Sequence, residues 1–318
     1  MIELHRHLDV SARISTLLEL AQILGIEGQS TSLESFRNRI LITTPGQSLE
    51  DVLTRFEFFQ RVLVRRDFLE RLAFEAVGDC WNEGIRKVEL RFSPAWACEK
   101  SSLSWEEILL HFEKGIARAL IQYPQIQVGL ICIGSRDFGI DSVEKTVDFF
   151  SQNRNSFVGL DLAGNEKDFP CRLFRSSFQK AKKAGARITV HAGESCGPEN
   201  IWEAIDDLGA ERIGHGIAAL QDPKLITELL KRQVTLEVCP TSNWITQCVP
   251  TLEKHPLKEL LRLGVRATIN TDDPGIFAVT LPGEVEISQK RMGLTAEDVK
   301  MCFEFAEKAS FLGHAREI

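Results

Sequence analysis

Eight short β-prone runs alternate with longer amphipathic segments along this chain of 318 residues. In chain order the runs are IELHRHL, VELRF, QVGLICI, FVGLDLA, RITVHAG, RIGHG, VTLEVCP and RATINTD. The segments between them, such as Asp67 to Trp81 and Trp105 to Leu120, place apolar residues three and four positions apart, as a helix requires. Strands that alternate with helices form right-handed βαβ crossovers and a parallel sheet. Eight such units allow the sheet to close, so the sequence predicts an α/β fold of the TIM (β/α)8 barrel type.

The longest crossover is the first, from about Asp9 to Arg86, and it contains a loop-like stretch from Thr43 to Ser48. We therefore expect extra helices inserted after strand one. The segment from Thr295 to Phe311 predicts a closing helix. Because no internal repeat, low-complexity tract or linker divides the chain, we expect a single domain over residues 1–318.

Composition and charge limit the classes of partner that this chain is expected to bind. A net charge of −7 argues against a nucleic-acid surface, which needs clustered Lys and Arg, and favours a small-molecule substrate. The eight cysteines form no C-x-x-C pair, and no signal peptide is expected because Ile2 to Leu8 already indicates a strand. We therefore expect reduced thiols and a cytoplasmic location. No apolar run approaches the roughly 20 residues of a membrane helix, so no membrane partner is expected.

Chemistry-bearing residues gather where the predicted strands end, which is the catalytic face of a barrel of this kind. His5 and His7 are separated by one residue on strand one, so both imidazoles lie on the same face. An H-x-H pair taken alone also fits two surface or core histidines. His191 after strand five and Asp272 after strand eight would complete three nitrogens and one oxygen, which suit a single Zn²⁺ ion with an open position for water.

Three further polar residues occupy strand ends. Glu194 follows His191 by three positions and is expected either to cap a helix or to act as a carboxylic acid that donates to a ring nitrogen. His215, between two glycines, is either a barrel histidine or metal ligand, or a general base that takes a proton from an activated water. Asp273 precedes Pro274, as a helix-capping residue would, and should face away from Asp272 if the strand is still extended there.

At this point the motifs resemble a known family. HRHLD, VELRFSP, LDLAGNE, VHAGE, RIGHG, LEVCPTSN and NTDDP, in this order and over almost the whole chain, resemble the adenosine deaminase branch of the amidohydrolase superfamily. The resemblance implies a hydrolase that adds water to C6 of an adenosine-type purine, releases ammonia and leaves a 6-oxo purine. It also implies one zinc per chain and no organic cofactor.

The resemblance assigns roles to individual residues. It implies zinc ligation by His5, His7, His191 and Asp272. His215 would orient and deprotonate the water, and Glu194 would protonate purine N1. The substrate contacts implied are Asp273 to N7, the Gly164 amide to N3, and Asp9 to the ribose. Asp9 could instead cap the helix that follows it.

The chain departs from the family pattern near the expected sugar site. Val10 and Ser11 stand where the family usually has Gly and a small residue, and they stiffen and fill that turn. Adenine, a cyclic or linear adenine nucleotide, or aminodeoxyfutalosine therefore stay open as substrates. Arg6, between the two ligands, should point into the layer between barrel and helices and pair there with a carboxylate.

Basic residues occur in the region inserted after strand one. Arg13, Arg37 and Arg39 form either a solvated helix face or an anchor for a phosphate or carboxylate tail.

Other functions compete with deamination. A dinuclear hydrolase generally needs a bridging group such as a modified Lys on strand four, but that strand ends LDLAGN and Lys167 lies beyond it. A non-deaminating mononuclear amidohydrolase shares the metal site. A non-enzymatic binding protein should have lost a catalytic group, and none is lost. The cytidine deaminase architecture is not expected, because the chain has no P-C-x-x-C motif.

Overall fold

Strands alternate with helices throughout the computed structural model, which describes residues 1–46 and 49–313. The strands of the described residues are β1 (Ile2–His7), β2 (Lys87–Phe92), β3 (Gln127–Ser135), β4 (Phe157–Ala163), β5 (Thr189–Ala192), β6 (Arg212–His215), β7 (Thr235–Val238) and β8 (Arg266–Ile269). Each lies within or overlaps one of the eight predicted runs, although β8 ends three residues before Asp272.

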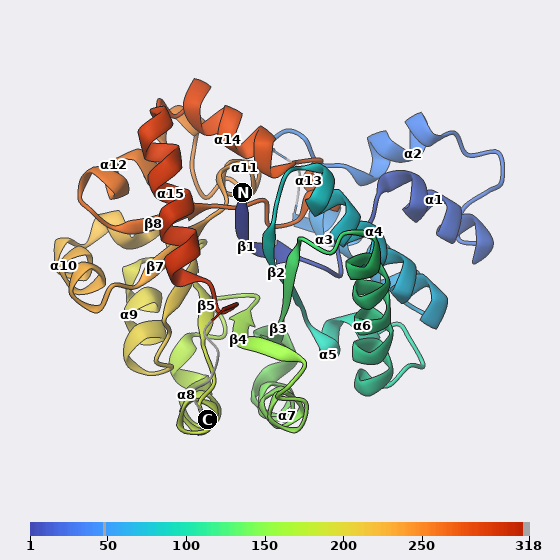
Figure 1. Cartoon of the computed structure of the whole chain (residues 1–318), viewed down its shortest axis with the longest axis horizontal. Coiled ribbons are helices and arrows are strands. Elements are labelled where there is room, and N and C mark those ends of the chain that lie inside the picture. Colours follow the sequence, from blue (N-terminus) through green and yellow to red (C-terminus); the bar gives the residue numbers. More distant parts are fainter. Residues whose placement is uncertain (47–48, 314–318) are drawn as a thin grey trace.

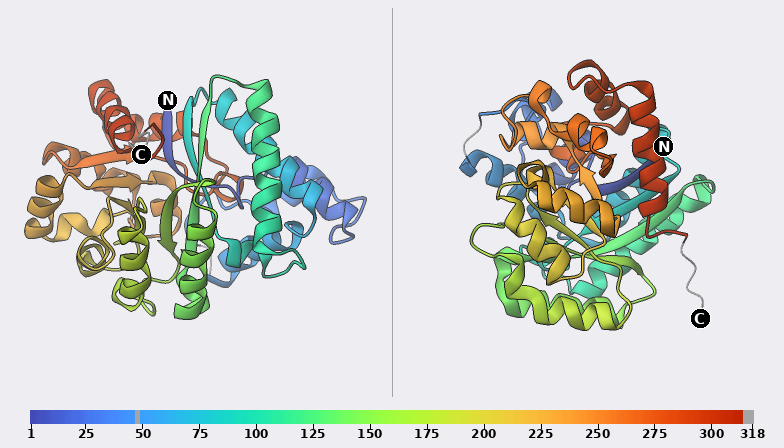
Figure 2. Two further views of the ribbon diagram at one scale, coloured as in Figure 1. Left: turned by 60° about the horizontal axis from the view of Figure 1, so that its bottom comes forward. Right: turned by 90° about the vertical axis from the view of Figure 1, so that its left-hand side faces the viewer.

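Helices connect and surround the strands (Figures 1 and 2). They are α1 (Ile14–Ile23), α2 (Leu33–Ile40), α3 (Leu49–Val62), α4 (Arg66–Asn82), α5 (Pro94–Cys98), α6 (Trp105–Gln122), α7 (Gly139–Gln152), α8 (Arg175–Lys183), α9 (Pro198–Asp206), α10 (Pro223–Arg232), α11 (Pro240–Ile245), α12 (Leu257–Arg262), α13 (Pro274–Phe277), α14 (Leu281–Lys290) and α15 (Ala296–Ala309). Short 3₁₀ turns are η1 (Arg136–Phe138), η2 (Cys171–Phe174), η3 (Ile217–Gln221) and η4 (Leu252–Lys254). The predicted closing helix is α15, capped by Thr295.

The strands form one ring. β1 to β4 and β5 to β8 pair in parallel in chain order. Single parallel bridges join the two sheets, Arg6 to Asp272 at one seam and Leu160 to Ile188 at the other. At the first seam His7 N donates to Asp272 O at 2.8 Å, and Asp272 N donates to His5 O at 3.0 Å. The (β/α)8 barrel is therefore confirmed, and the seam that closes it joins the two segments that provide candidate metal ligands.

The predicted insertion after strand one is also confirmed. α4 is the helix of the first crossover, and α1, α2 and α3 precede it; α1 and α2 project from one side of the barrel in both figures. In the predicted loop from Thr43 to Ser48, residues 43–46 are irregular and residues 47–48 lie outside the described part.

Charged side chains fill part of the barrel interior beneath the strand ends. Arg91 and Arg212 are fully buried, and both contact Glu237, with Arg91 Nη2 at 2.7 Å from Oε2 and Arg212 Nε at 2.6 Å from Oε1. Glu89 accepts from Phe311 N at 2.5 Å and Ser310 Oγ at 2.7 Å, so the segment after α15 covers this end of the barrel. The predicted site residues lie at the opposite, carboxyl ends of the strands.

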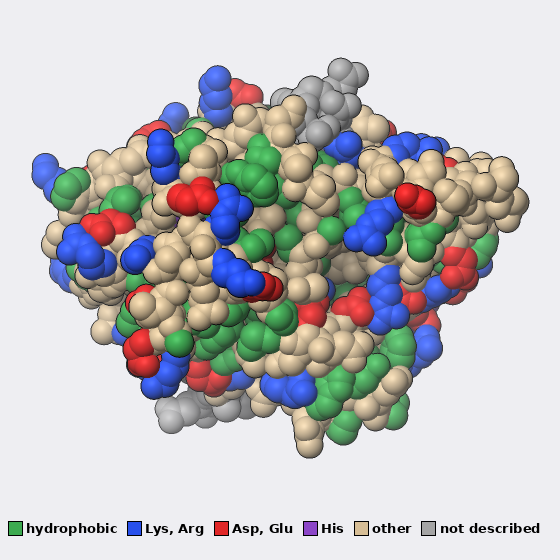
Figure 3. Space-filling view, turned by 90° about the horizontal axis from the view of Figure 1, so that it is seen from above, with side chains coloured by type: hydrophobic (Ala, Val, Ile, Leu, Met, Phe, Trp, Pro, Cys, Tyr) green, Lys and Arg blue, Asp and Glu red, His purple; other side chains and the backbone are tan. Residues whose placement is uncertain are grey.

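The described helices and one face of the surface bear on two of the expected absences. Among the described helices, none is both long and apolar enough to span a membrane. On the face shown in Figure 3, the Lys and Arg side chains are interspersed with Asp and Glu. The absence of a nucleic-acid partner stays a prediction.

Candidate active site

The four predicted metal ligands converge at the barrel mouth. His5 and His7 lie on β1, with His5 inside an irregularity in the pairing of that strand with β2 and His7 after it. His191 lies on β5, and Asp272 follows β8. Asp272 Oδ1 is 3.1 Å from His5 Nε2 and 3.3 Å from His7 Nε2. The donor atoms of all four residues lie within 4.8 Å of one another. Ligands about 2.1 Å from one tetrahedral ion are about 3.4 Å apart, so this spacing fits a shared metal.

Carboxylates orient two of the imidazoles from behind. His5 Nδ1 is 2.8 Å from Glu237 Oε2, and His191 Nδ1 is 3.1 Å from Asp161 Oδ2. Arg91 bridges the two carboxylates, with Nη1 at 2.8 Å from Asp161 and Nη2 at 2.7 Å from Glu237. Such a partner places the ring hydrogen on Nδ1 and leaves Nε2 as a metal ligand.

These supporting residues were missed from the sequence. A weak signal existed, because Arg91, Asp161 and Glu237 are charged residues inside otherwise apolar strand runs. Their pairing could not be foreseen, since it joins different strands through the barrel interior.

The residues present fit a metal ion. His5 Nε2 is a buried nitrogen without a hydrogen-bond partner, although it faces Asp272 and the other ligand atoms. Burial lowers the pKa of His191 to about 3, which keeps its imidazole neutral and able to ligate. Burial alone would lower the pKa of His7, but Asp273 and Asp272 outweigh it and raise that pKa to about 9 when no cation is present. Carboxylates that attract a proton to this position would equally attract a metal ion.

A second group of donors shares part of this site. Cys239 and His215 also lie within 4.8 Å of His5 and Asp272 donor atoms. Burial raises the pKa of the Cys239 thiol well above its ordinary value, so the neutral imidazole set is the better ligand group.

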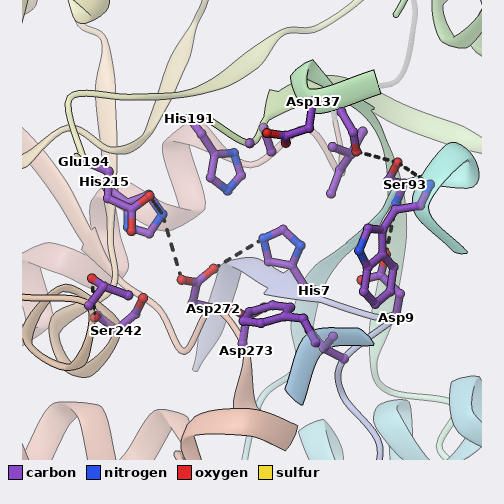
Figure 4. Close-up of a pocket in the computed structure, with 18 of the residues that line it drawn as sticks. His7, Asp9, Ser93, Asp137, His191, Glu194, His215, Ser242, Asp272 and Asp273 are labelled. Carbon is purple, nitrogen blue, oxygen red and sulfur yellow. Dashed lines mark hydrogen bonds and ion pairs between the residues drawn. The ribbon is translucent and has the colours of Figure 1, made fainter. Parts of the chain in front are cut away.

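The candidate acid and base lie beside the ligands. His215 Nε2 is 3.5 Å from Glu194 Oε2 and 3.9 Å from Asp272 Oδ2 (Figure 4). On the other side of the ring, His215 Nδ1 is 3.0 Å from the Asn243 side-chain amide, which fixes the ring plane. His215 and Asp272 both have left-handed backbones, with φ of 61° and 65°, an unfavourable conformation that clusters at functional sites.

The loop that bears Glu194 is held by a buried carboxylate. Glu166 accepts hydrogen bonds from the backbone N–H groups of Gly193, Glu194 and Ser195, at 2.7, 3.0 and 3.1 Å. Gly193 has φ 66°, and a Cβ there would lie 2.4 Å from Ile201, so only glycine fits this turn. Burial raises the pKa of the Glu194 carboxyl, and Asp272 and Glu166 raise it further. These conditions favour a protonated acid.

Asp273 is not a capping residue. It occupies the N-cap position of α13, but its side chain makes no capping hydrogen bond and lines the cavity together with Asp272. The two neighbours share one direction because Asp272 is left-handed, so the premise of an extended strand was wrong there. Burial raises the pKa of Asp273 well above its ordinary value, and the Asp272 carboxylate adds to that shift.

The alternative role of Asp9 as a helix cap is wrong. α1 has Arg13 at its N-cap, and Asp9 Oδ2 accepts instead from Ser93 N at 3.1 Å. Asp9 and Val10 line the same cavity as the metal ligands, and burial raises the pKa of Asp9 to about 6. Gly164 lines it as well, with φ 109°.

One cavity of about 290 Å³ joins these groups. Its apolar walls include Phe56 from α3, Trp96 from α5 and Phe277 from α13, so the inserted helices help to enclose it. The sequence did not identify these aromatic residues, nor the lining residues Ser93, Ser135 and Asp137.

The arginines of the inserted region lie elsewhere. Arg13 forms a bidentate pair with Asp79, with its shortest contact at 2.7 Å, and Arg39 pairs with Glu27. Arg37 is exposed, and none of the three lines the cavity. This arrangement supports the solvated-face interpretation rather than an anchor for the substrate.

Arg6 behaves as the sequence predicts. Its Nη1 contacts Glu83 at the end of α4 at 3.0 Å and Glu3 at 3.3 Å. Arg6 therefore ties β1 to the helix layer.

The fold and site define a class of protein: (β/α)8-barrel hydrolases of the amidohydrolase type, with a metal-binding mouth beside an acid and a base. Comparison with known proteins narrows the class. The family model described as adenosine deaminase matches residues 1–317. The chain belongs to the adenosine deaminase family, whose members are metal-dependent hydrolytic deaminases acting on C–N bonds.

Curated relatives and solved structures agree with this family assignment. The adenosine deaminase of Aliivibrio fischeri (strain MJ11) is 39% identical over 300 residues, covering 94% of this chain and 90% of that protein. That of Pectobacterium atrosepticum is 38% identical over 312 residues, covering 98% and 92%. The structure of an adenine deaminase from Arthrobacter aurescens superimposes with TM-score 0.88 at 27% identity, covering 99% of this chain and 94% of that one. An N6-methyl-AMP deaminase from Arabidopsis thaliana gives 0.84 at 27%, covering 99% and 92%.

Proposed function

We propose that this protein is a zinc-dependent adenosine deaminase, which adds water to C6 of adenosine and releases ammonia and inosine. The observation that carries the proposal is the placement of Glu194 and His215 beside the ligand group in one cavity. The curated relatives named above are adenosine deaminases, which supports the same reaction.

His5, His7, His191 and Asp272 would hold one zinc ion, which supplies a water of lowered pKa next to C6. Lys167 is exposed, and no lysine occurs among the described residues that line the cavity, so none of these residues supplies a bridging lysine for a second ion. Metal analysis of protein purified without added metal should find one zinc per chain. Two metals, or full activity after exhaustive chelation, would contradict this assignment.

The chain's own groups would move the protons. His215 takes a proton from the attacking water, and Asn243 keeps its ring facing Asp272 during the transfer. Glu194 gives a proton to N1, which makes C6 electrophilic, and the loop held by Glu166 keeps the acid in place. The amino group leaves C6 as ammonia after accepting the proton that His215 took from the water, and the remaining hydroxyl proton passes to Glu194, which leaves the 6-oxo purine.

The remaining lining residues would orient the purine nucleoside. Asp273 contacts N7, the Gly164 amide donates to N3, and Asp9 accepts a hydrogen bond from a ribose hydroxyl. Asp9 supports a nucleoside over free adenine because its carboxylate lies in the cavity instead of capping α1. A buried carboxylate that loses its hydroxyl partner costs about 1 to 3 kcal/mol.

The experiment is a panel of ammonia-release assays with adenosine, 2′-deoxyadenosine, adenine, aminodeoxyfutalosine, and cyclic and linear AMP. We expect the nucleosides to have the highest kcat/KM. Adenine or a nucleotide as the best substrate would overturn the assignment of adenosine while leaving the deaminase family intact. A cytoplasmic location is proposed as well, and the eight unpaired cysteines support it.

A further inference from the structure

Asp137 is a carboxylate in the cavity that no sequence motif identified. It lies in η1, directly after β3, is exposed to solvent, and lines the same cavity as Asp9 and the metal ligands. Its Oδ1 accepts from Asn165 N at 3.3 Å. A Cβ built on Gly164 would lie 2.1 Å from its Oδ2, so the carboxylate packs directly against the backbone of Gly164.

If the proposed function holds, this contact places Asp137 beside the bound substrate. The Gly164 amide is proposed to bind purine N3. N3 and N9 are both bonded to C4, so a group against Gly164 lies beside the N9 substituent and across the ring from C6. Figure 4 agrees, because Asp137, Ser93 and Asp9 lie on the side of the cavity opposite Glu194 and His215.

The charge at this end of the cavity is negative. Asp9 and Asp137 both line it, and neither Lys nor Arg occurs among its described lining residues. Arg136, next to Asp137 in the chain, is fully buried, and its guanidinium donates to Phe169 O, Cys171 Sγ and His191 O. Arg13 and Arg39, which a phosphate could have recruited, are paired with carboxylates elsewhere.

We propose that Asp137 is a specificity-determining residue that selects substrates by the charge of the N9 substituent. Its carboxylate disfavours a 5′-phosphate and favours a neutral or cationic group at the 5′ position. Because the side chain is partly solvated, one unit charge acting over about 6 Å should change kcat/KM about tenfold.

The test compares three substrates that differ in 5′ charge: adenosine, AMP, and 5′-amino-5′-deoxyadenosine, whose amine is protonated at pH 7. The variant is Asp137→Asn, which keeps the oxygen that accepts from Asn165 N. The matched control is Asp168→Asn. Asp168 is an exposed carboxylate that also contacts Asn165, because its Oδ2 accepts from the Asn165 side-chain amide at 2.8 Å. Asp168 does not line the cavity.

In Asp137→Asn, kcat/KM for the amine relative to adenosine should fall about tenfold, and that for AMP relative to adenosine should rise at least about tenfold. The value for adenosine, whose 5′ group is neutral, is the reference for both ratios in each variant. Added 0.5 M NaCl should reduce the difference between amine and AMP in the parent and much less in the variant, because salt screens exposed charges. Asp168→Asn should match the parent in every ratio.

Ratios in Asp137→Asn within twofold of the parent, at an unchanged thermal midpoint, would overturn the role of Asp137 even if adenosine is turned over well. Equal changes in Asp168→Asn would also overturn it, since they would show a general field effect. Failure of the parent to deaminate adenosine would instead overturn the proposed function, and the two failures are thereby distinguished.

Discussion

Removing the charge of Glu237 should weaken metal binding and folding together, although Glu237 does not touch the metal. Its Oε2 faces Arg91 Nη2 at 2.7 Å and His5 Nδ1 at 2.8 Å, and its Oε1 faces Arg212 Nε at 2.6 Å and Thr189 Oγ1 at 2.9 Å. In Glu237→Gln, one of these two oxygens becomes an NH₂ group that opposes two donors. The side chain is fully buried, so water cannot compensate.

Glu237→Gln should change two measurable quantities, the free energy of unfolding and the affinity for metal. Breaking a buried ionic network by removing one partner costs about 3 to 5 kcal/mol in the free energy of unfolding. Losing the carboxylate behind a metal-binding histidine lowers metal affinity by about 10- to 100-fold. Urea unfolding of the metal-free protein measures the first quantity, and competition with a chromophoric zinc chelator measures the second.

The matched control is Glu259→Gln, which removes a partly exposed carboxylate paired with Arg262 on α12. It should leave both measurements unchanged. If Glu237→Gln binds zinc within twofold of the parent and unfolds at the same urea concentration, then Glu237 neither orients His5 nor balances the buried arginines, and the reasoning fails.

Three other predictions test the acid, the sugar contact and a buried histidine. Glu194→Gln should keep the fold and the metal while lowering kcat far more than substrate affinity, because proton donation matters in the transition state; steady-state kinetics within a few-fold of the parent would assign the proton to another group. Asp9→Ala should lower kcat/KM for adenosine more than for adenine, and an equal loss on both would refute the ribose contact. Burial lowers the pKa of His255 to about 3, and its Nδ1 accepts from Leu257 N at 3.1 Å, so the folded protein keeps this imidazole neutral. The neutral imidazole contributes its full stabilisation to the folded protein above pH 6.5. This contribution falls by about 1.4 kcal/mol per pH unit as the pH falls toward 3, because the unfolded chain then binds a proton that the folded protein does not. The free energy of unfolding of His255→Gln should therefore vary less steeply with pH than that of the parent in this range. Equal slopes would mean that His255 is protonated in the folded state.

The sequence by itself determined the barrel and most of the candidate site. Alternating strands and helices leave few ways to pack, and a period of two places His5 and His7 on one face whatever the rest of the chain does. Strand ends of a parallel barrel meet at one rim, so His191, His215 and Asp272 could be placed there before any contact was known. The single domain over residues 1–318 stays a prediction.

Only the tertiary structure decided how these residues are held and which neighbours join them. His5 and Glu237 lie 232 positions apart, and no local pattern specifies that they share a hydrogen bond through the barrel interior. The direction of Asp273 depends on the left-handed backbone of Asp272, which the closing seam with β1 imposes and which residue type does not predict. Asp137 reaches the cavity because Gly164, directly after the next strand β4, leaves it space. Contacts between strands depend on register and on backbone angles, and these are set by the packing of the whole barrel rather than by neighbours along the chain.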